Sequence, residues 1–267
     1  MTRRGPDWRA VLLLLFAVVV LGFSGWLVVT WPPEPPPSTV ATSGEPQGRQ
    51  STGQSTDSTG GPTEQGEPAT LLSTAFAENE NGGKVLVLGD SISAGWDAAK
   101  PRAAWPQQLL RGLRDDVDGV RVRTVAVPGV TVDGAADLER PRGNDLVVVE
   151  LGTNDLAVTG DAAAYRSDLR DLLGDLAAGS PDAPIVVLGP WRGPEETAGF
   201  DEAGRALCER QGCTYVALAV AYAEAGPIPA GQPVARGTSD GQHPGSRGHA
   251  AIADLVLETL TQPLDAS

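Results

Sequence analysis

The segment KVLVLGDS, residues 84–91, joins a short apolar run directly to a Gly-Asp-Ser turn. Its apolar residues follow one another without an alternating polar face, which is typical of a strand buried on both sides. Turn residues then end the strand abruptly. The same pattern predicts four more strands, at residues 120–127, 145–151, 184–188 and 214–220.

The segments between these strands have helical rather than strand-like patterns. Short apolar strands that alternate with helices indicate a parallel sheet covered by helices on both faces. We therefore predict a flavodoxin-like α/β fold, a three-layer α/β/α sandwich with a five-stranded parallel sheet. The predicted helices cover residues 105–114, 135–139, 161–178, 200–211 and 246–261.

The N-terminal part of the chain differs from this pattern. Residues 10–30 are 21 residues without a charged side chain, which is long enough to cross a bilayer. Arg3, Arg4 and Arg9 precede them, and basic flanks stay on the cytoplasmic side. We predict that residues 1–31 form a basic flank and an uncleaved transmembrane signal anchor, with the rest of the chain extracytoplasmic. A cleaved signal peptide, which would give a secreted protein, is the alternative.

A Pro/Gly/Ser/Thr-rich stretch follows and has almost no large apolar residues with which to form a core. We predict a linker at residues 32–83 and a catalytic domain at residues 84–267. Residues 71–83 are either a short helix or an ordered lead-in to the first strand.

The charge of the chain excludes some functions. The net charge is −14, and residues 84–267 contain 16 basic and 26 acidic side chains. Binding to a phosphate backbone requires clustered Lys and Arg. We therefore expect no nucleic-acid partner.

The two cysteines, Cys208 and Cys213, are five residues apart. Two thiols with no nearby histidine do not make a tetrahedral zinc site, so we expect no metal there. The pair would form a local disulfide outside the cell and would remain as two free thiols inside it.

Residues suited to acyl transfer follow the predicted strands. Ser91 follows the first, Gly129 the second and Asn154 the third, and the loop after the fifth contains Asp240 and His243. The carboxyl ends of parallel strands lie at one edge of a sheet. The sequence thus brings a hydroxyl, a base, a carboxylate and hydrogen-bond donors to one place, as acyl transfer requires. Each motif alone is more often just a turn or a helix cap, and it is their combination that points to acyl transfer.

Four segments, LGDSISAG, AVPGVT, LGTND and DGQHPGSRGHAAIA, resemble the four sequence blocks of the SGNH (GDSL-like) hydrolase superfamily. The similarity extends over residues 84–263. It implies that Ser91 is the nucleophile, that His243 is the general base and acid, and that Asp240 orients His243. It also implies an oxyanion hole made by the backbone N–H groups of Ser91 and Gly129 and the side-chain amide of Asn154.

A competing motif, Gly-Thr-Ser-Asp-Gly at residues 237–241, matches the nucleophile elbow of α/β-hydrolases. That elbow needs a hydrophobic strand before its serine and a helix directly after it. PVAR precedes Ser239 and QHPG follows it, so we interpret the match as a coincidence. The second histidine, His249, lies in the predicted last helix, where a packing role is expected.

The resemblance implies a serine esterase that needs no metal or cofactor, acting on a small-molecule, lipid or glycan ester. An O-acetylated cell-envelope glycan fits an extracytoplasmic enzyme. Alternatives are an envelope glycan O-acyltransferase with the same residues and a non-catalytic binding module with the same fold. Trp96, Trp191 and Arg192 fall in loops at the same edge and are candidate substrate contacts.

Overall fold

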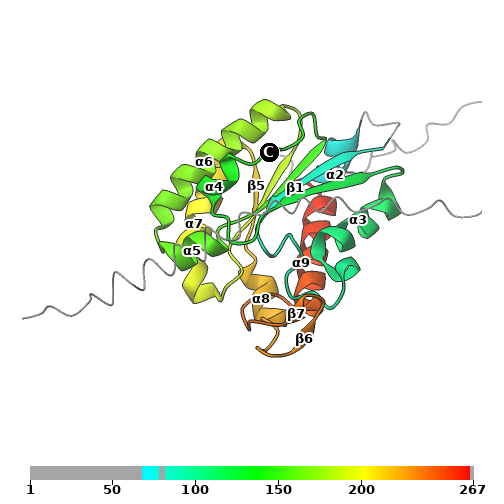
Figure 1. Ribbon diagram of the computed structural model, residues 1–267. Coiled ribbons are helices and arrows are strands. Elements are labelled where there is room, and N and C mark those ends of the chain that lie inside the picture. The colour runs from blue at the N-terminus through cyan, green and yellow to red at the C-terminus, as the bar shows by residue number, and fades with distance from the viewer. Residues whose placement is uncertain (1–67, 78–81, 265–267) are drawn as a thin grey trace, which may run out of the picture. The chain divides into compact units, whose positions relative to one another are not determined.

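The computed structural model describes residues 68–77 and 82–264. Its main sheet has five parallel strands in the order β2-β1-β3-β4-β5. This confirms the predicted three-layer sandwich (Figure 1). The strands are β1 (Lys84–Gly89), β2 (Arg121–Ala126), β3 (Leu146–Glu150), β4 (Ile185–Leu188) and β5 (Thr214–Val216).

Helices cover both faces of the sheet (Figure 1). One layer contains α3, α8 and α9 with the short α2, and the other contains α4, α6 and α7. The α-helices are α2 (Leu71–Phe76), α3 (Trp105–Asp116), α4 (Val132–Ala136), α5 (Thr153–Val158), α6 (Ala162–Gly179), α7 (Pro194–Gln211), α8 (Ala219–Ala225) and α9 (Ser246–Thr261).

Strand β1 shows why the central strands lack polar residues. Val85 and Val87 contribute to the core beneath α3 and α9, whereas Leu86 and Leu88 contribute to the core beneath α4 and α6. All four side chains are almost completely buried. Because successive side chains in a strand point to opposite faces, a strand between two helical layers needs apolar residues at every position.

The predicted strand at residues 214–220 is too long. Strand β5 ends at Val216, and the chain then forms α8 from Ala219 to Ala225. This segment, AVAYAEA, is rich in alanine, the residue with the highest helix propensity. Its apolar face packs in the core beneath α9, so burial in a helix replaces the expected burial in a strand.

The predicted linker also ends earlier than residue 83. Helix α2 packs on α9 and adds Ala75 to the core. Thr70 forms a β-bridge with Pro263, and the Leu264 N–H donates to the Ala69 carbonyl. Residues 71–76 therefore belong to the folded unit, as the helix that the sequence left open.

A 3-10 helix, η1 (Pro101–Ala103), precedes α3. A short hairpin, β6 (Pro233–Val234) and β7 (Gly237–Thr238), lies between α8 and α9.

Within the described residues, no helix combines the length and the apolar character needed to cross a membrane. The predicted anchor at residues 10–30 and most of the predicted linker lie outside these residues.

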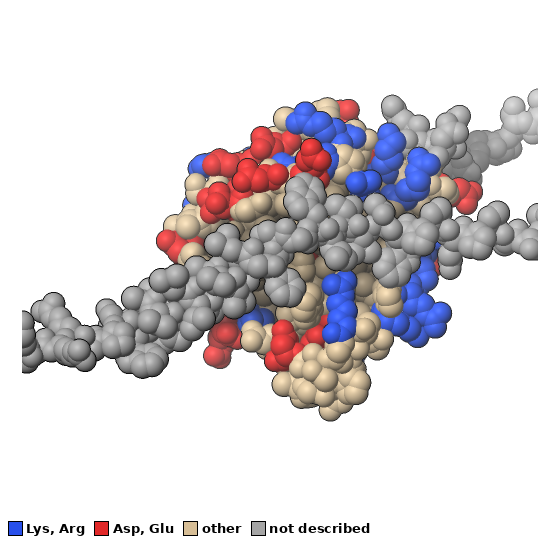
Figure 2. Space-filling view, viewed as in Figure 1, with Lys and Arg blue, Asp and Glu red and all other residues tan. Residues whose placement is uncertain are grey.

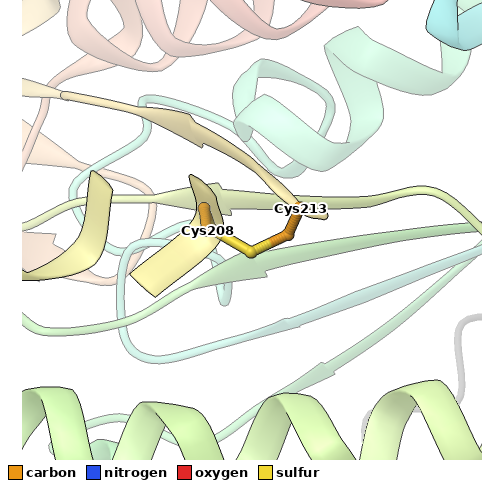
Figure 3. The surroundings of a disulfide bond; sticks show 2 residues. All are labelled: Cys208 and Cys213. Carbon is orange, nitrogen blue, oxygen red and sulfur yellow. A yellow bond between two sulfur atoms is a disulfide. The ribbon is translucent and has the colours of Figure 1, made fainter. Parts of the chain in front are cut away.

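Cys208 and Cys213 form a disulfide across the end of α7 (Figure 3). Gly212 ends the helix with a φ of 76°, and its N–H donates to the Cys208 carbonyl. A left-handed residue at this position turns the chain back on itself, which glycine does without strain. The turn brings the two Cα atoms to 4.5 Å, as the disulfide requires.

The acidic and basic side chains are not evenly distributed. In Figure 2, Asp and Glu gather over α4 and α6, whereas Lys and Arg lie more toward α3. The overall acidity of the sequence therefore does not describe each part of the surface.

Candidate active site

Ser91 lies in the tight turn that follows β1. The Asp90 carbonyl accepts from the Ala94 N–H at 3.0 Å, and the Ser91 carbonyl accepts from the Trp96 N–H at 2.9 Å. A Cβ atom on Gly89 would lie 2.1 Å from Ser93 Oγ, so only glycine fits at the start of this turn. The turn leaves Ser91 only 7% exposed, at the carboxyl edge of the sheet.

Asp240 and His243 lie on the segment between α8 and α9, far from Ser91 in the sequence. Asp240 Oδ1 accepts from the backbone N–H of Gln242 at 2.8 Å and from that of His243 at 3.3 Å. This Asx-type turn directs the histidine ring back over the aspartate. The backbone of His243 is fixed as well, because its carbonyl accepts from the Ile228 N–H at 3.1 Å.

The three side chains form one continuous chain of hydrogen bonds. Asp240 Oδ2 lies 2.7 Å from His243 Nδ1, and His243 Nε2 lies 2.8 Å from Ser91 Oγ. With Nδ1 donating to the carboxylate, Nε2 is free to accept the Ser91 proton. The structure thus brings together the three residues that the sequence predicted as nucleophile, base and orienting carboxylate.

The Asp240 carboxylate is stabilised in its charged form. Partial burial would by itself raise the pKa of Asp240, but the Gln242 N–H and the interactions with His243 lower it below the ordinary value. A charged carboxylate beside Nδ1 stabilises an imidazolium ring during proton transfer. The electrostatics therefore match the geometry of a general base.

Two backbone N–H groups at the carboxyl edge of the sheet, those of Ser91 and Gly129, have no intramolecular acceptor within the described part of the chain. Gly129 follows β2 with a φ of 82°, a conformation that favours glycine, and nothing would contact a Cβ atom there. The two donors are therefore unoccupied at the carboxyl edge where they were predicted.

Asn154 is placed as predicted, but its amide group is engaged. Its Nδ2 donates to Asp90 Oδ2 at 2.8 Å and to the Val130 carbonyl at 3.0 Å. An oxyanion would have to share one of these hydrogens. The sequence could not reveal this competition, because it depends on the spacing of three different strand ends.

The candidate substrate contacts divide into two kinds. The ring centroids of Trp96 and His243 are 5.8 Å apart, so Trp96 lies beside the site. Arg192 is half-buried and donates to Gln242 Oε1 at 2.8 Å, next to His243. Trp191, by contrast, is fully buried and packs edge-on against Tyr222. The expectation that Trp191 contacts substrate is therefore wrong, because its ring forms part of the core.

Ser239, the serine of the competing motif, is a structural residue. Its hydroxyl hydrogen-bonds to Asp97 Oδ2 and to the Ile228 carbonyl, and accepts from the Gly241 N–H. Asp97 is 3% exposed and has a φ of 61°, unusual for a residue other than glycine. This buried contact, which the sequence analysis missed, fastens the segment that carries Asp240.

His249 also has the packing role expected of it. It is fully buried, with Nε2 2.9 Å from the Trp96 carbonyl and Nδ1 accepting from the Trp105 N–H at 3.4 Å. Desolvation lowers the pKa of His249 to about 4. The ring is therefore a neutral bridge between α9, α3 and the Trp96 loop.

Among the described residues, one group has ligand atoms close enough for a metal ion. One atom each from Asp97, Asp240 and His243 lie within 4.8 Å of one another. All three side chains are already hydrogen-bonded to Ser239, to each other or to Ser91. These three side chains are therefore already engaged in hydrogen bonds of the candidate active site.

Two buried acids, Glu150 and Asp155, lie near the carboxyl end of β3. Glu150 ends β3 and is completely buried, and Asp155 accepts from the Val132 N–H with both carboxylate oxygens at 3.2 Å. The glutamate at the end of an otherwise apolar strand, LVVVE, was the available signal. A charged residue in a strand buried on both faces requires a polar partner.

Comparisons with known proteins agree with this arrangement. The model of the GDSL-like lipase/acylhydrolase family matches residues 87–251. No curated protein sequence matches the chain significantly.

Solved structures share the fold. The crystal structure of TesA is 23% identical, with a TM-score of 0.55 over 68% of this chain and 99% of that one. A phospholipase A1 from Streptomyces albidoflavus NA297 is 17% identical, with a TM-score of 0.52 over 67% and 99%. A two-domain esterase active on acetylated mannans is 16% identical, with a TM-score of 0.52 over 71% and 51%.

Proposed function

The chain belongs to the GDSL-like lipase/acylhydrolase family of carboxylic ester hydrolases, and on that premise we propose that it is a serine esterase that forms an acyl-Ser91 intermediate. The observation that carries this proposal is the unbroken chain from Asp240 through His243 to Ser91, with distances of 2.7 and 2.8 Å. A nucleophile bonded to a base that is itself oriented by a carboxylate is the arrangement that acyl transfer needs.

The first half of the reaction acylates the enzyme. Ser91 Oγ attacks the ester carbonyl carbon, and its proton passes to His243 Nε2. Asp240 stabilises the resulting imidazolium ring. The carbon–oxygen bond to the alcohol then breaks as His243 returns the proton to the leaving oxygen.

The second half releases the acid. Water attacks the acyl carbon and gives a proton to His243, the bond to Ser91 Oγ breaks, and the serine recovers its proton. The negative oxygen formed in each half binds the N–H groups of Ser91 and Gly129. Asn154 adds a third donor by sharing an amide hydrogen with the oxyanion.

We propose an extracytoplasmic ester as the substrate, with an O-acetylated envelope glycan favoured over a lipid ester. The anchor and linker predicted from residues 10–30 and 32–70 support this location, as does the disulfide between Cys208 and Cys213. Trp96 lies half-exposed beside His243 and offers an aromatic surface for a sugar ring. Arg192 adds a donor for hydroxyl or carbonyl groups.

A fluorophosphonate probe tests the chemistry directly, because it reacts only with an activated serine. We expect it to label the wild-type chain at Ser91 and to leave Ser91→Ala unlabelled. Hydrolysis of p-nitrophenyl acetate by Ser91→Ala should fall by about 10³-fold or more, since the covalent route is lost. Ser167→Ala, at a half-buried position of α6, is the matched control and should behave as wild type.

The proposal fails if Ser91→Ala still hydrolyses the ester at the wild-type rate or if the probe labels another serine. A membrane-impermeant form of the same probe tests the location. It should label the protein on intact cells, whereas labelling only after lysis would contradict the extracytoplasmic placement.

A further inference from the structure

Two carboxyl groups lie side by side behind the nucleophile, and the mechanism above gives neither of them a role. Asp90 directly precedes Ser91, and Glu150 is the last residue of β3. Both are 0% exposed. The parallel pairing of β1 with β3 sets Gly89 opposite Glu150, which brings the Glu150 side chain against the turn that holds Ser91.

The hydrogen bonds of Glu150 are incomplete for a carboxylate. Its Oε2 accepts from the Ser93 N–H at 3.1 Å and from the Ser93 hydroxyl at 2.8 Å. Its Oε1 is buried and receives no hydrogen bond from any N–H or hydroxyl group of the described residues. Asp90 follows Gly89, the β1 residue that pairs with Glu150, and the charge of Asp90 is near enough to raise the pKa of Glu150. A proton between the two acids satisfies the otherwise unpaired oxygen.

Asp90 is well supplied with donors on its other sides. Its Oδ1 accepts from the Ile92 N–H at 2.8 Å, and its Oδ2 accepts from Asn154 Nδ2 at 2.8 Å. Asp90 therefore connects three features of the site: the turn after Ser91, the Asn154 amide and Glu150. Any shift of its carboxylate would move the candidate oxyanion donor.

The charges around Asp90 and Glu150 favour a state in which the two carboxyl groups together keep one proton. Within the described part of the chain, no Lys or Arg forms an ion pair with either acid. Burial raises the pKa of both groups, and the charge of Asp90 raises that of Glu150 further. Asp155, on α5, is the other acid whose charge raises the pKa of Asp90. His243 is hydrogen-bonded to Ser91, the residue after Asp90. Burial and mutual repulsion make it costly in free energy for both neighbouring carboxyl groups to be ionised at once.

We propose that Glu150 is a positioning residue that works as a neutral carboxylic acid, donating its proton to Asp90 so that Asp90 holds the Asn154 amide and the Ser91 turn in place. This inference rests on the proposed function of Ser91 and Asn154. Loss of the proton would leave two repelling carboxylates and an Asn154 amide out of position. The enzyme should therefore lose turnover at alkaline pH for a reason unrelated to His243.

Glu150→Gln tests the proposal, because the amide has the shape of the neutral acid. Its NH₂ group donates to Asp90, and its carbonyl oxygen accepts from Ser93, but it has no proton to lose. We expect kcat for p-nitrophenyl acetate at neutral pH to stay within about threefold of wild type. At alkaline pH the wild-type chain should lose kcat in a step that Glu150→Gln lacks. Glu202→Gln, at an exposed position of α7, is the matched control and should keep the wild-type profile.

A spectroscopic measurement examines the proton itself. The infrared difference spectrum between wild type and Glu150→Gln at neutral pH should contain the carbonyl band of a protonated carboxylic acid. A difference spectrum with only carboxylate bands overturns the proposal, as does an alkaline loss of kcat that is unchanged in Glu150→Gln. Because the infrared test needs no turnover, it separates this inference from the esterase proposal, which the labelling of Ser91 tests.

Discussion

Ser91 and Asn154 follow strands β1 and β3 directly, whereas Asp240 and His243 lie on the long segment between α8 and α9. Behind the first pair are Asp90 and Glu150, both fully buried. On the other side, the Asp240 side chain is 43% exposed and that of His243 is 20% exposed. The nucleophile half of the site is thus built into the core, and the base half is held against it from the surface.

The two halves are also fastened differently. The nucleophile half is fixed by the pairing of β1 with β3 and by buried side-chain contacts. The base half depends on a few polar links, chiefly the contact of Ser239 with Asp97 and the hydrogen bond from the Arg236 guanidinium to the Ala94 carbonyl. The Arg236 guanidinium also lies 5.5 Å from the Trp96 ring centroid. We therefore expect changes in the first half to affect chemistry most, and changes in the second to affect local stability.

Among the variants that test the difference between the two halves, Asn154→Ala should cause the largest loss of kcat. The substitution removes one oxyanion donor, and such donors contribute about 10²–10³-fold to turnover. It also leaves Asp90 without one of its hydrogen bonds. We expect kcat for p-nitrophenyl acetate to fall by about that factor with little change in KM.

The alternative is that Asn154 only organises the loops. In that case kcat would be nearly unchanged while the melting temperature fell, because Asp90 and the Val130 carbonyl would both lose a partner. Measuring both quantities on the same variant separates a donor to the oxyanion from a structural residue.

The sequence predicted residues of both halves of this site, but by different routes. Parallel strands bring their carboxyl ends together by geometry, so Ser91, Gly129 and Asn154 could be placed from the apolar runs before them. The motifs then identified Asp240 and His243. The short strand β5 and the helix α8 could not be separated, since both are apolar and only their three-dimensional packing distinguishes them.

Other features depend on contacts that no local pattern encodes. Trp191 follows a strand at the functional edge, yet its ring turns into the core against Tyr222. The contact between Ser239 and Asp97 joins residues 142 positions apart. Helix α2 lies before the first strand and is ordered because α9, at the other end of the chain, covers it. Such long-range partners become visible only once the fold is known.

His249 joins α9 to the loop that carries Trp96, and its titration should affect the stability of the fold. Burial lowers the pKa of His249 from 6.5 to about 4. Between these values the unfolded chain binds a proton that the folded chain does not, so the stability falls as the pH falls. The loss should be on the order of 3 kcal/mol from about pH 6.5 to pH 4.

Urea unfolding of wild type and His249→Gln at several pH values measures this loss. Glutamine can still donate to the Trp96 carbonyl and accept from the Trp105 N–H, but it does not titrate. The difference in unfolding free energy between the two proteins should shrink toward acid pH. Parallel curves would show that His249 does not control this part of the stability.

Ser239→Ala tests the base half and should change stability more than activity. Its removal leaves the buried Asp97 carboxylate without the hydroxyl that it contacts, and such a loss costs about 1–3 kcal/mol of stability. The bonds from Asp240 to His243 and from His243 to Ser91 do not include Ser239. We therefore expect a lower unfolding free energy with kcat within about tenfold of wild type. Ser91→Ala should give the opposite result, with normal stability and turnover lower by about 10³-fold or more. The contrary outcome is a folded Ser239→Ala variant without turnover or fluorophosphonate labelling. The base half would then be as important for the chemistry as the nucleophile half, and the proposed difference between the two halves would be wrong.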